Sequence, residues 1–243
     1  PNSAYAYEER KVLMDCEECI KADIGAKGGH VLYFRCATDA LEWLYSEGNK
    51  WMMGWAHSPY EHDAAMFGIE SEPDELIGVD SYELIGVDSY CHQLVNQLTG
   101  QIHDIKTVHE RLLQYDKGPF LICDCTAAIH HISLRAVKVC QYADAVVISG
   151  HKICCPDIAF MWIDDRLFDW LGGGKDVRNQ WGLKHGSISV GHVLALADAV
   201  EWACDSTRLN ATNNRNLRLF DYLYCELKKA DIDFSVIADA KPS

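Results

Sequence analysis

The sequence contains no apolar run that approaches the length of about 20 residues needed by a membrane-spanning helix. Its first residues carry neither the basic segment nor the apolar core of a signal peptide. Positive charge is also scarce, because 22 Lys and Arg stand against 36 Asp and Glu, for a net charge of −14. Such a chain is repelled by the phosphates of nucleic acids and of anionic membranes. We therefore expect neither nucleic acid nor a membrane as a partner.

A disulfide framework is absent as well. Eleven cysteines are scattered through apolar segments, and without a secretion signal they indicate reduced thiols in a cytoplasmic protein. Cys16 and Cys19 have the spacing of half a zinc site, but no second pair of Cys or His follows at finger-like spacing. We therefore predict no metal site and keep zinc as the lesser alternative.

Three apolar runs of strand length lie in the middle of the chain, at residues 119–123, 145–148 and 158–163. Between the first two, residues 133–142 mix polar and apolar side chains with helical spacing. A strand, a helix and a strand within about thirty residues form a βαβ unit, whose strands are parallel and buried on both faces. The fold class is therefore α/β, with a mainly parallel sheet sandwiched between layers of helices.

The length of 243 residues suits one large α/β domain. Further helices are expected at residues 6–22, from 38 onward, 190–203 and 213–229, and further strands at 30–34 and 52–57. Residues 75–82 recur unchanged as residues 83–90. A single repeated octapeptide indicates a local duplication rather than a solenoid, which needs several repeats. We assign it no function.

Two charged residues follow the buried strands of the βαβ unit. Asp124 closes the first strand, and Lys152 comes just after the second. The carboxyl ends of parallel strands meet at one edge of a sheet, where α/β proteins bind ligands, so these side chains should lie close together. This arrangement suits a lysine that holds pyridoxal 5′-phosphate (PLP) as an imine and an aspartate that pairs with its pyridine nitrogen. From the pair alone, an ordinary salt bridge is the more common alternative.

Short segments in the order of the chain favour PLP. Ser-Gly-His-Lys at 149–152, followed by Pro156, resembles the Ser-x-His-Lys-x-x-Gly-Pro segment of class V aminotransferases, and of cysteine desulfurases in particular. Asp124 stands where that family has its Asp-x-x-Gln aspartate. Other segments are similar to the remaining motifs of the family, at residues 1–3, 35–40, 58–62, 95–100, 172–174 and 184–187. Their common order indicates the fold of a PLP-dependent enzyme.

The resemblance implies roles for residues around the cofactor ring. Lys152 would be the Schiff-base lysine and would abstract the α-proton of the substrate. Asp124 would pair with the ring nitrogen, and Asn96 would lie beside the cofactor. His62 would stack on the ring and act in proton transfer.

The resemblance also implies a phosphate site. The turn at Ala37 and Thr38 would open a helix under the cofactor phosphate, where backbone N–H groups and the helix dipole favour an anion. Thr38, Ser149 and His151 would hold the phosphate. Ser187 would reach the phosphate site of a neighbouring subunit, which implies a homodimer.

Several positions depart from the family pattern. Ala127 replaces the glutamine that bonds the ring oxygen of the cofactor, so the tuning of the imine is expected to differ. Cys36 and Ala37 replace two glycines at the phosphate turn, where added side chains crowd the backbone. Lys184 replaces an arginine, whose planar fork suits a carboxylate.

The resemblance covers residues 1–203 and implies one PLP-binding large domain over residues 1–243. The usual N-terminal segment and C-terminal small domain are not matched, and residues 231–243 are expected to begin a truncated small domain. The family's persulfide-forming cysteine lies in the unmatched part, so no residue takes this role by resemblance. The thiols nearest the predicted site are Cys36, Cys125, Cys154 and Cys155.

The leading hypothesis is a PLP-dependent cysteine desulfurase, which converts L-cysteine to L-alanine and transfers the sulfur. It predicts a small amino-acid substrate and contact with a sulfur-acceptor protein. One alternative is an aminotransferase, β-lyase or racemase of the same lineage. Another is a truncated homologue that binds PLP or a partner without turnover.

Overall fold

The computed structural model describes residues 4–50, 53–58, 68–70, 87–96, 100–114, 118–155, 157–172, 189–230 and 232. Its centre is a seven-stranded sheet in the order β1-β7-β6-β5-β4-β2-β3. The strands are β1 (His30–Phe34), β2 (Trp55–His57), β3 (Ile69–Glu70), β4 (Ser89–Gln93), β5 (Phe120–Asp124), β6 (Ala145–Ser149) and β7 (Ala159–Ile163). β7 is antiparallel to both of its neighbours, and all the other pairs are parallel. Every strand except β7 therefore points the same way, which confirms the mainly parallel α/β sheet.

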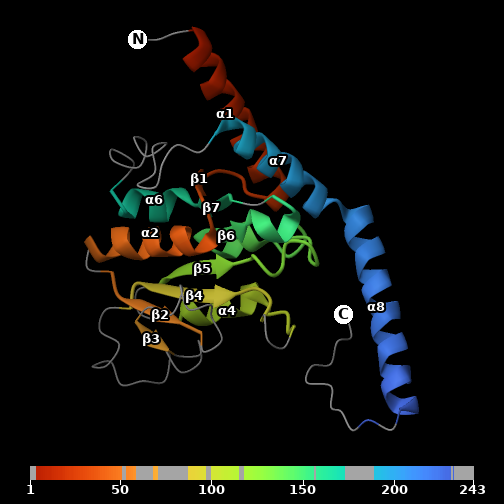
Figure 1. Cartoon of the computed structure of the whole chain (residues 1–243). Coiled ribbons are helices and arrows are strands. Elements are labelled where there is room, and N and C mark those ends of the chain that lie inside the picture. Colours follow the sequence, from red (N-terminus) through yellow and green to blue (C-terminus); the bar gives the residue numbers. More distant parts are fainter. Residues whose placement is uncertain are drawn as a thin grey trace.

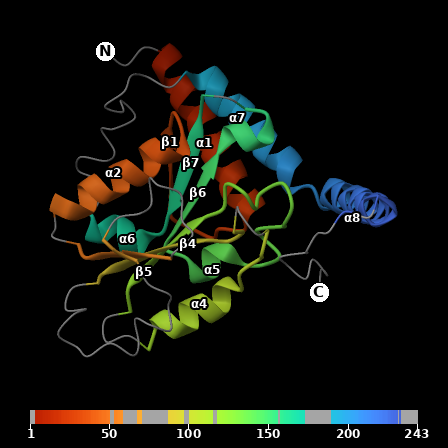
Figure 2. The same ribbon diagram turned by 60° about the horizontal axis from the view of Figure 1, so that its bottom comes forward.

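Helices cover both faces of this sheet (Figures 1 and 2). On one face, α2 (Ala37–Lys50) and α6 (Asp165–Trp170) pack over the central strands. On the other face, the core is completed by α1 (Ala4–Ile24), α4 (Ile105–Leu112), α5 (Val139–Tyr142) and α7 (Val190–Cys204). α1 and α7 lie side by side. The expected three-layer arrangement is confirmed.

β5 shows why the central strands appear in the sequence as unbroken apolar runs. Leu121 and Cys123 face the layer of α4 and α5, whereas Phe120 and Ile122 face α2, and all four side chains are buried. A strand buried on both faces needs apolar residues at every position. The runs that predicted β5, β6 and β7 agree with the observed strands to within about one residue, a margin smaller than the usual uncertainty of element ends.

The predicted helix at residues 133–142 is wrong. Turns cover most of residues 126–138, and only the four residues of α5 are helical. Ser133 Oγ accepts a hydrogen bond from Ala136 N–H at 3.2 Å, and Lys138 has a left-handed φ of 56°. Local side-chain bonds of this kind compete with a helix. β4 and α4 were not predicted; the second octapeptide copy supplies Ser89 and Tyr90 of β4, and the first copy lies outside the described residues.

α8 (Ser206–Lys229) extends away from the three layers (Figure 1) and begins earlier than the predicted residue 213. Leu209 is the single buried residue of this helix, all of which is described. Two contacts fix its first half: the Arg208 guanidinium lies 3.5 Å from the Trp202 ring centroid, and Asn213 Nδ2 donates to His131 O at 2.9 Å. Across the described ranges, none of the helices combines the length and apolar character that a membrane crossing requires.

Candidate functional site

Buried polar residues gather at one edge of the sheet. Ten polar or charged residues are buried within the described ranges, and six of them lie at or just past the ends of β2, β4, β5 and β6. These six are His57, Ser58, Gln93, Asn96, Asp124 and Ser149. Burying polar groups is costly unless they are hydrogen-bonded, so their concentration marks a site rather than ordinary core. Parallel α/β sheets bind ligands at this carboxyl edge.

The side chains of Gln93, Asp124 and Ser149 point to the same face of the sheet. Side chains alternate between the two faces along a strand. The residues two positions earlier all pack in the cluster beside α2; they are Cys91, Ile122 and Val147. The strand register agrees, because Gln93 pairs with Asp124 in β4 and β5. The polar ends of three adjacent strands therefore form one surface under the α2 layer.

Asp124 is held by the turn that follows β5. Its Oδ1 accepts the Thr126 N–H at 2.8 Å, and the Thr126 hydroxyl accepts the Ser149 N–H at 3.2 Å. Thr126 therefore connects the end of β5 to the end of β6. The Asp124 carboxylate is 9% exposed and is bonded through Oδ1 to the turn at this edge.

Lys152 lies on η2 (Gly150–Ile153), a short 3₁₀ helix that directly follows β6. Ile153 is buried in the core, whereas Lys152 is exposed. His151 Nδ1 lies 2.6 Å from the Ser149 hydroxyl, and burial, followed by the charge of Lys152, lowers the pKa of His151. Among the described residues Lys152 takes part in no ion pair, so the salt bridge considered above is not formed. Its amine is accessible to a ligand.

Gly150 explains how η2 fits against the sheet. A Cβ at this position would lie 2.6 Å from the Ile158 carbonyl oxygen and closer still to that of Cys155. The Gly150 N–H also donates to Ile158 O at 2.9 Å. The backbone that carries Lys152 therefore approaches its neighbours more closely than any side chain allows.

We expect Gly150→Ala to lower the free energy of unfolding by about 2 kcal/mol, because the new Cβ must displace two backbone carbonyls. Urea denaturation of both proteins measures this difference. Gly191→Ala is the matched control, since its Cβ would meet only Ser189 Oγ, at 3.7 Å. Equal losses in the two variants would contradict the assigned packing.

The N-terminus of α2 lies at the same edge of the sheet. Phe34, at the end of β1, pairs with Ala159 of β7, and Ser149 pairs with Ala159 from the other side. Phe34 and Ser149 are therefore about 10 Å apart across the sheet, and α2 begins shortly after Phe34. Ala37 and Thr38 are the first two residues of α2 and are partly buried. Free N–H groups at such a helix start suit a phosphate.

Asn96 lies at this edge as well, just past β4. It is 3% exposed; its N–H donates to Gln101 O at 2.9 Å, and its carbonyl accepts the Gly100 N–H at 2.8 Å. Two other predicted site residues, His62 and Ser187, lie outside the described residues, as do residues 231 and 233–243, where a small domain was expected to begin.

Three residues at this edge, His57, Gln93 and Thr126, were not predicted from the sequence, and Ser58 was predicted only as part of the segment 58–62. His57 Nδ1 lies 2.9 Å from Ser58 O, immediately after β2. Gln93 was missed because β4 has a largely polar sequence and no apolar run marks it. A polar residue at the end of a strand was the available signal.

The thiols nearest the edge differ in access. Cys125 and Cys155 are buried, and burial raises the pKa of both thiols. Cys154 is exposed, and Cys36 is half-buried. A reactive thiol needs access and thiolate character. Cys125 and Cys155 are therefore poor nucleophiles in this fold.

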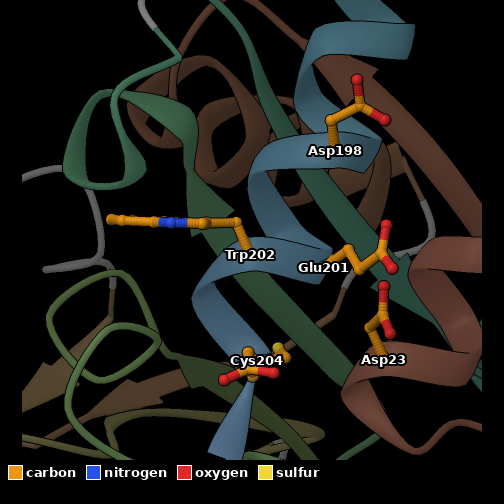
Figure 3. Close-up of a pocket in the computed structure, with 6 residues that line it drawn as sticks. Asp23, Asp198, Glu201, Trp202 and Cys204 are labelled. Atoms are coloured by element: carbon orange, nitrogen blue, oxygen red, sulfur yellow. The ribbon is translucent and has the colours of Figure 1, made fainter. Parts of the chain in front are cut away.

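A cavity of about 470 Å³ lies by α1 and α7. It is lined by Asp23, Asp198, Glu201, Trp202, Cys204 and Asp205. In Figure 3 the carboxylates of Asp23 and Glu201 approach each other, while the Trp202 ring points away from them. Burial, followed by the charge of Glu201, raises the pKa of Asp23. None of the predicted site residues that the structure describes lines this cavity, so the cavity is distinct from the described part of the carboxyl edge.

The fold is shared with NifS-like proteins, a cysteine desulfurase and aminotransferases of known structure. The chain belongs to the class V aminotransferase family, whose model matches residues 86–241. A search of curated protein sequences finds no match.

Solved structures with this fold include desulfurases and aminotransferases. A NifS-like protein has a TM-score of 0.72 at 19% identity, with 94% of this chain and 68% of that chain covered. The apo structure of a cysteine desulfurase from Thermococcus onnurineus NA1 has a TM-score of 0.70 at 17% identity, with 95% and 66% covered. An aspartate aminotransferase from Thermus thermophilus has a TM-score of 0.61 at 16% identity, with 85% and 65% covered. The chain thus spans about two thirds of the length of these structures.

Family membership implies PLP as the cofactor, and the residues at the edge fit it. Asp124 is a buried carboxylate that would pair with a protonated pyridine nitrogen, and Lys152 has an exposed amine that would react with the aldehyde. The start of α2, the Ser149 hydroxyl and the His151 ring are hydrogen-bonding groups suited to a phosphate.

Proposed function

We propose that the chain is a PLP-dependent enzyme of the cysteine-desulfurase type, which cleaves the C–S bond of L-cysteine. The observation that carries the proposal is the position of Asp124 and Lys152 at one carboxyl edge: Asp124 ends β5, and Lys152 lies on η2, directly after the adjacent parallel strand β6. Bound PLP supplies an electron sink for charge that develops at the substrate α-carbon. Likeness to NifS-like proteins and to a cysteine desulfurase favours this substrate class over others.

In this proposal the chain's own residues bind the cofactor and move one proton. Asp124 keeps the pyridine nitrogen protonated, because a buried carboxylate beside it favours positive charge. The Lys152 amine holds the cofactor and then accepts the α-proton of the substrate. Thr38, Ser149 and His151 hold the phosphate.

Four further residues complete the proposed site. The Ala37 N–H would belong to the phosphate turn, Asn96 would lie beside the ring, and His62 would stack on the ring and assist proton transfer. Ser187 would reach the phosphate of a second subunit, so the proposed enzyme is a homodimer.

The proposed reaction balances without an oxidant. The C–S bond of cysteine breaks, the carbon fragment takes up protons and leaves as alanine, and the sulfur joins a thiol as a persulfide. Cysteine and a thiol thus give alanine and a persulfide. The acceptor is a thiol of a partner protein or the exposed Cys154, because burial disfavours Cys125 and Cys155.

The first experiment tests cofactor capture. Purified protein is mixed with PLP, its visible spectrum is recorded, and borohydride reduction is followed by peptide mass spectrometry. We expect a visible absorption band and a reduced adduct on Lys152. An adduct that scatters over surface lysines, or none at saturating PLP, overturns the proposal.

The second experiment tests the reaction. With L-cysteine and dithiothreitol, a desulfurase releases alanine and sulfide in equal amounts. Pyruvate would instead identify a β-lyase, D-cysteine a racemase, and a requirement for a 2-oxo acid an aminotransferase. PLP captured on Lys152 without any product would leave a binding protein. Cys154→Ser separates an internal from an external acceptor, because only an internal one makes the first turnover depend on Cys154.

A further inference from the structure

α8 extends beyond the three layers with most of its surface exposed (Figures 1 and 2). Leu209 is its single buried residue, and contacts of Arg208 and Asn213 hold its first half. Contiguous exposed apolar surface marks an interaction site, because a helix gains most of its stability from packing an apolar face. Along the second half of α8, five large apolar side chains are between 38% and 66% exposed: Leu217, Leu219, Phe220, Tyr222 and Leu223.

Four apolar residues of this half form a stripe with the spacing of a coiled-coil seam. They follow one another at intervals of three, four and three residues, which places them on one face of the helix. Leu217 and Phe220 are exposed, and the other two are half-buried. The rings of Phe220 and Tyr224 stack with their centroids 6.3 Å apart, so the stripe is continuous. The residues of this α8 stripe are Leu217, Phe220, Tyr224 and Leu227.

Opposite charges flank the α8 stripe and fit a second copy of the same helix. Asp221 and Lys228 lie on the same side of the stripe, each one position after a stripe residue, and both are exposed. Within one chain they are about 10 Å apart along the helix axis, which is too far to pair. In an antiparallel pair in which Phe220 faces Tyr224 of the second copy, Asp221 of each copy flanks Lys228 of the other. Two ion pairs then form across the contact.

These charges also select one orientation and one register. A shift of one copy by a heptad in either direction would set Asp221 beside Asp221, or Lys228 beside Lys228, and like charges repel. In a parallel pair the same two residues would flank the uncharged Asn216 and Leu223, so no ion pair would form. The charge pattern is therefore complementary to itself in one antiparallel arrangement.

The position of α8 leaves room for this arrangement. α8 begins at Ser206, and the centre of the contact, at residue 222, lies about 24 Å further along the helix. The three-layer bodies of the two copies would therefore join the helix pair at opposite ends, about 50 Å apart.

We propose that the chain self-associates through an antiparallel pair of α8 helices, in which the α8 stripes pack together and Asp221 pairs with Lys228 across the contact. The contact is isologous, so each feature occurs twice. It does not depend on PLP, and the separation of the bodies makes it distinct from the contact through which Ser187 would reach a second subunit. If both contacts form, the protein is a pair of dimers, and loss of the α8 contact halves its mass.

Phe220→Glu tests the apolar part of the contact. Mass is measured by sedimentation equilibrium between about 1 and 100 µM, where a contact at the small end of specific interfaces dissociates. We expect Phe220→Glu to raise the dissociation constant at least about a hundredfold and to halve the mass. Leu219→Glu is the matched control: Leu219 is adjacent and 54% exposed but lies outside the stripe, so its variant should keep the wild-type mass. Circular dichroism and urea denaturation check that both variants fold.

Charge reversal tests the orientation. Asp221→Lys and Lys228→Asp, each alone, set like charges against each other and are expected to raise the dissociation constant about tenfold. The double variant Asp221→Lys/Lys228→Asp restores both ion pairs and should return to within about threefold of wild type. A role inside one chain would give no such rescue, because the two residues are too far apart to pair.

Equal masses of wild type and Phe220→Glu over the whole concentration range would overturn the inference. Equal loss of mass in Phe220→Glu and Leu219→Glu, or no rescue in the double variant, would overturn it as well. If another segment or another protein covers the stripe, Phe220→Glu changes stability or partner binding but not the mass of the purified protein, and the inference is wrong. If Phe220→Glu does not fold, the charge variants carry the test.

Discussion

Replacing Lys152 by alanine is expected to abolish covalent capture of PLP and to change the free energy of unfolding by less than about 0.5 kcal/mol. The Lys152 side chain is exposed and takes part in no ion pair with the described residues, so its removal leaves no buried group without a partner. Gly150 and Ile153, which anchor η2, are buried and unchanged. Intact-mass measurement after borohydride reduction gives the yield of adduct, and urea denaturation gives the stability.

Lys138→Ala is the matched control for this prediction. Lys138 is also exposed, but a long region of turns separates it from the end of β5. Lys138→Ala should capture PLP as the wild type does. If Lys152→Ala and wild type gave equal yields of adduct, the covalent site would lie on another lysine, and the proposed role of the carboxyl edge would be wrong.

The strands that the sequence predicted share one physical property, which is burial on both faces. β5, β6 and β7 are continuous apolar runs because each lies between two helical layers. The two apolar runs of β5 and β6 also predict that Asp124 and Lys152 lie at one edge of the sheet, since the strands of a βαβ unit are parallel. The parallel pairing of β5 with β6 confirms this step.

The elements that the sequence did not predict are those in which local chemistry overrides periodicity. β4 is buried at every position, yet its sequence is Ser-Tyr-Cys-His-Gln and contains no apolar run. Its last residue, Gln93, belongs to the polar edge rather than to the core. Gln93 could be recognised only from its register with Asp124, which the sequence does not contain. Thr126 was missed for the same reason: its role depends on the contact with Ser149 on another strand. Local rules fail most readily where a site interrupts the core.

Acidification is expected to destabilise the protein, with His92 making a large contribution. His92 is 2% exposed, and neither ring nitrogen has a hydrogen-bond partner among the described residues. Its ring stacks 5.9 Å from Tyr90 and meets the His103 ring edge-on at 4.5 Å. Burial, followed by the charge of His103, lowers the pKa of His92 to about 3.

The direction of the effect follows from which state binds the proton. In the unfolded chain His92 has an ordinary pKa of about 6.5, so between about pH 6.5 and pH 3 the unfolded state is protonated first. Stability is therefore complete above this range and falls as the pH falls through it. At pH 5 the loss due to His92 is about 2 kcal/mol relative to pH 7.5. Burial also lowers the pKa of His103 and of His130, so both add to the loss of stability in acid. Burial raises the pKa of Asp164 to about 6, so Asp164 takes up a proton in the folded state and offsets part of this loss.

His92→Phe isolates this contribution, because it keeps an aromatic ring and removes the titrating group. Between pH 7.5 and pH 5 the variant should lose about 2 kcal/mol less stability than wild type in urea denaturation. His192→Phe, on an exposed position of α7, should keep the wild-type dependence. Equal losses in His92→Phe and wild type would show that His92 does not gain a proton on unfolding. His92 and its neighbour Gln93 face opposite sides of the sheet. His92→Phe should therefore leave PLP capture at pH 7.5 unchanged. The acid sensitivity due to His92 would then be separate from the role of β4 in the site.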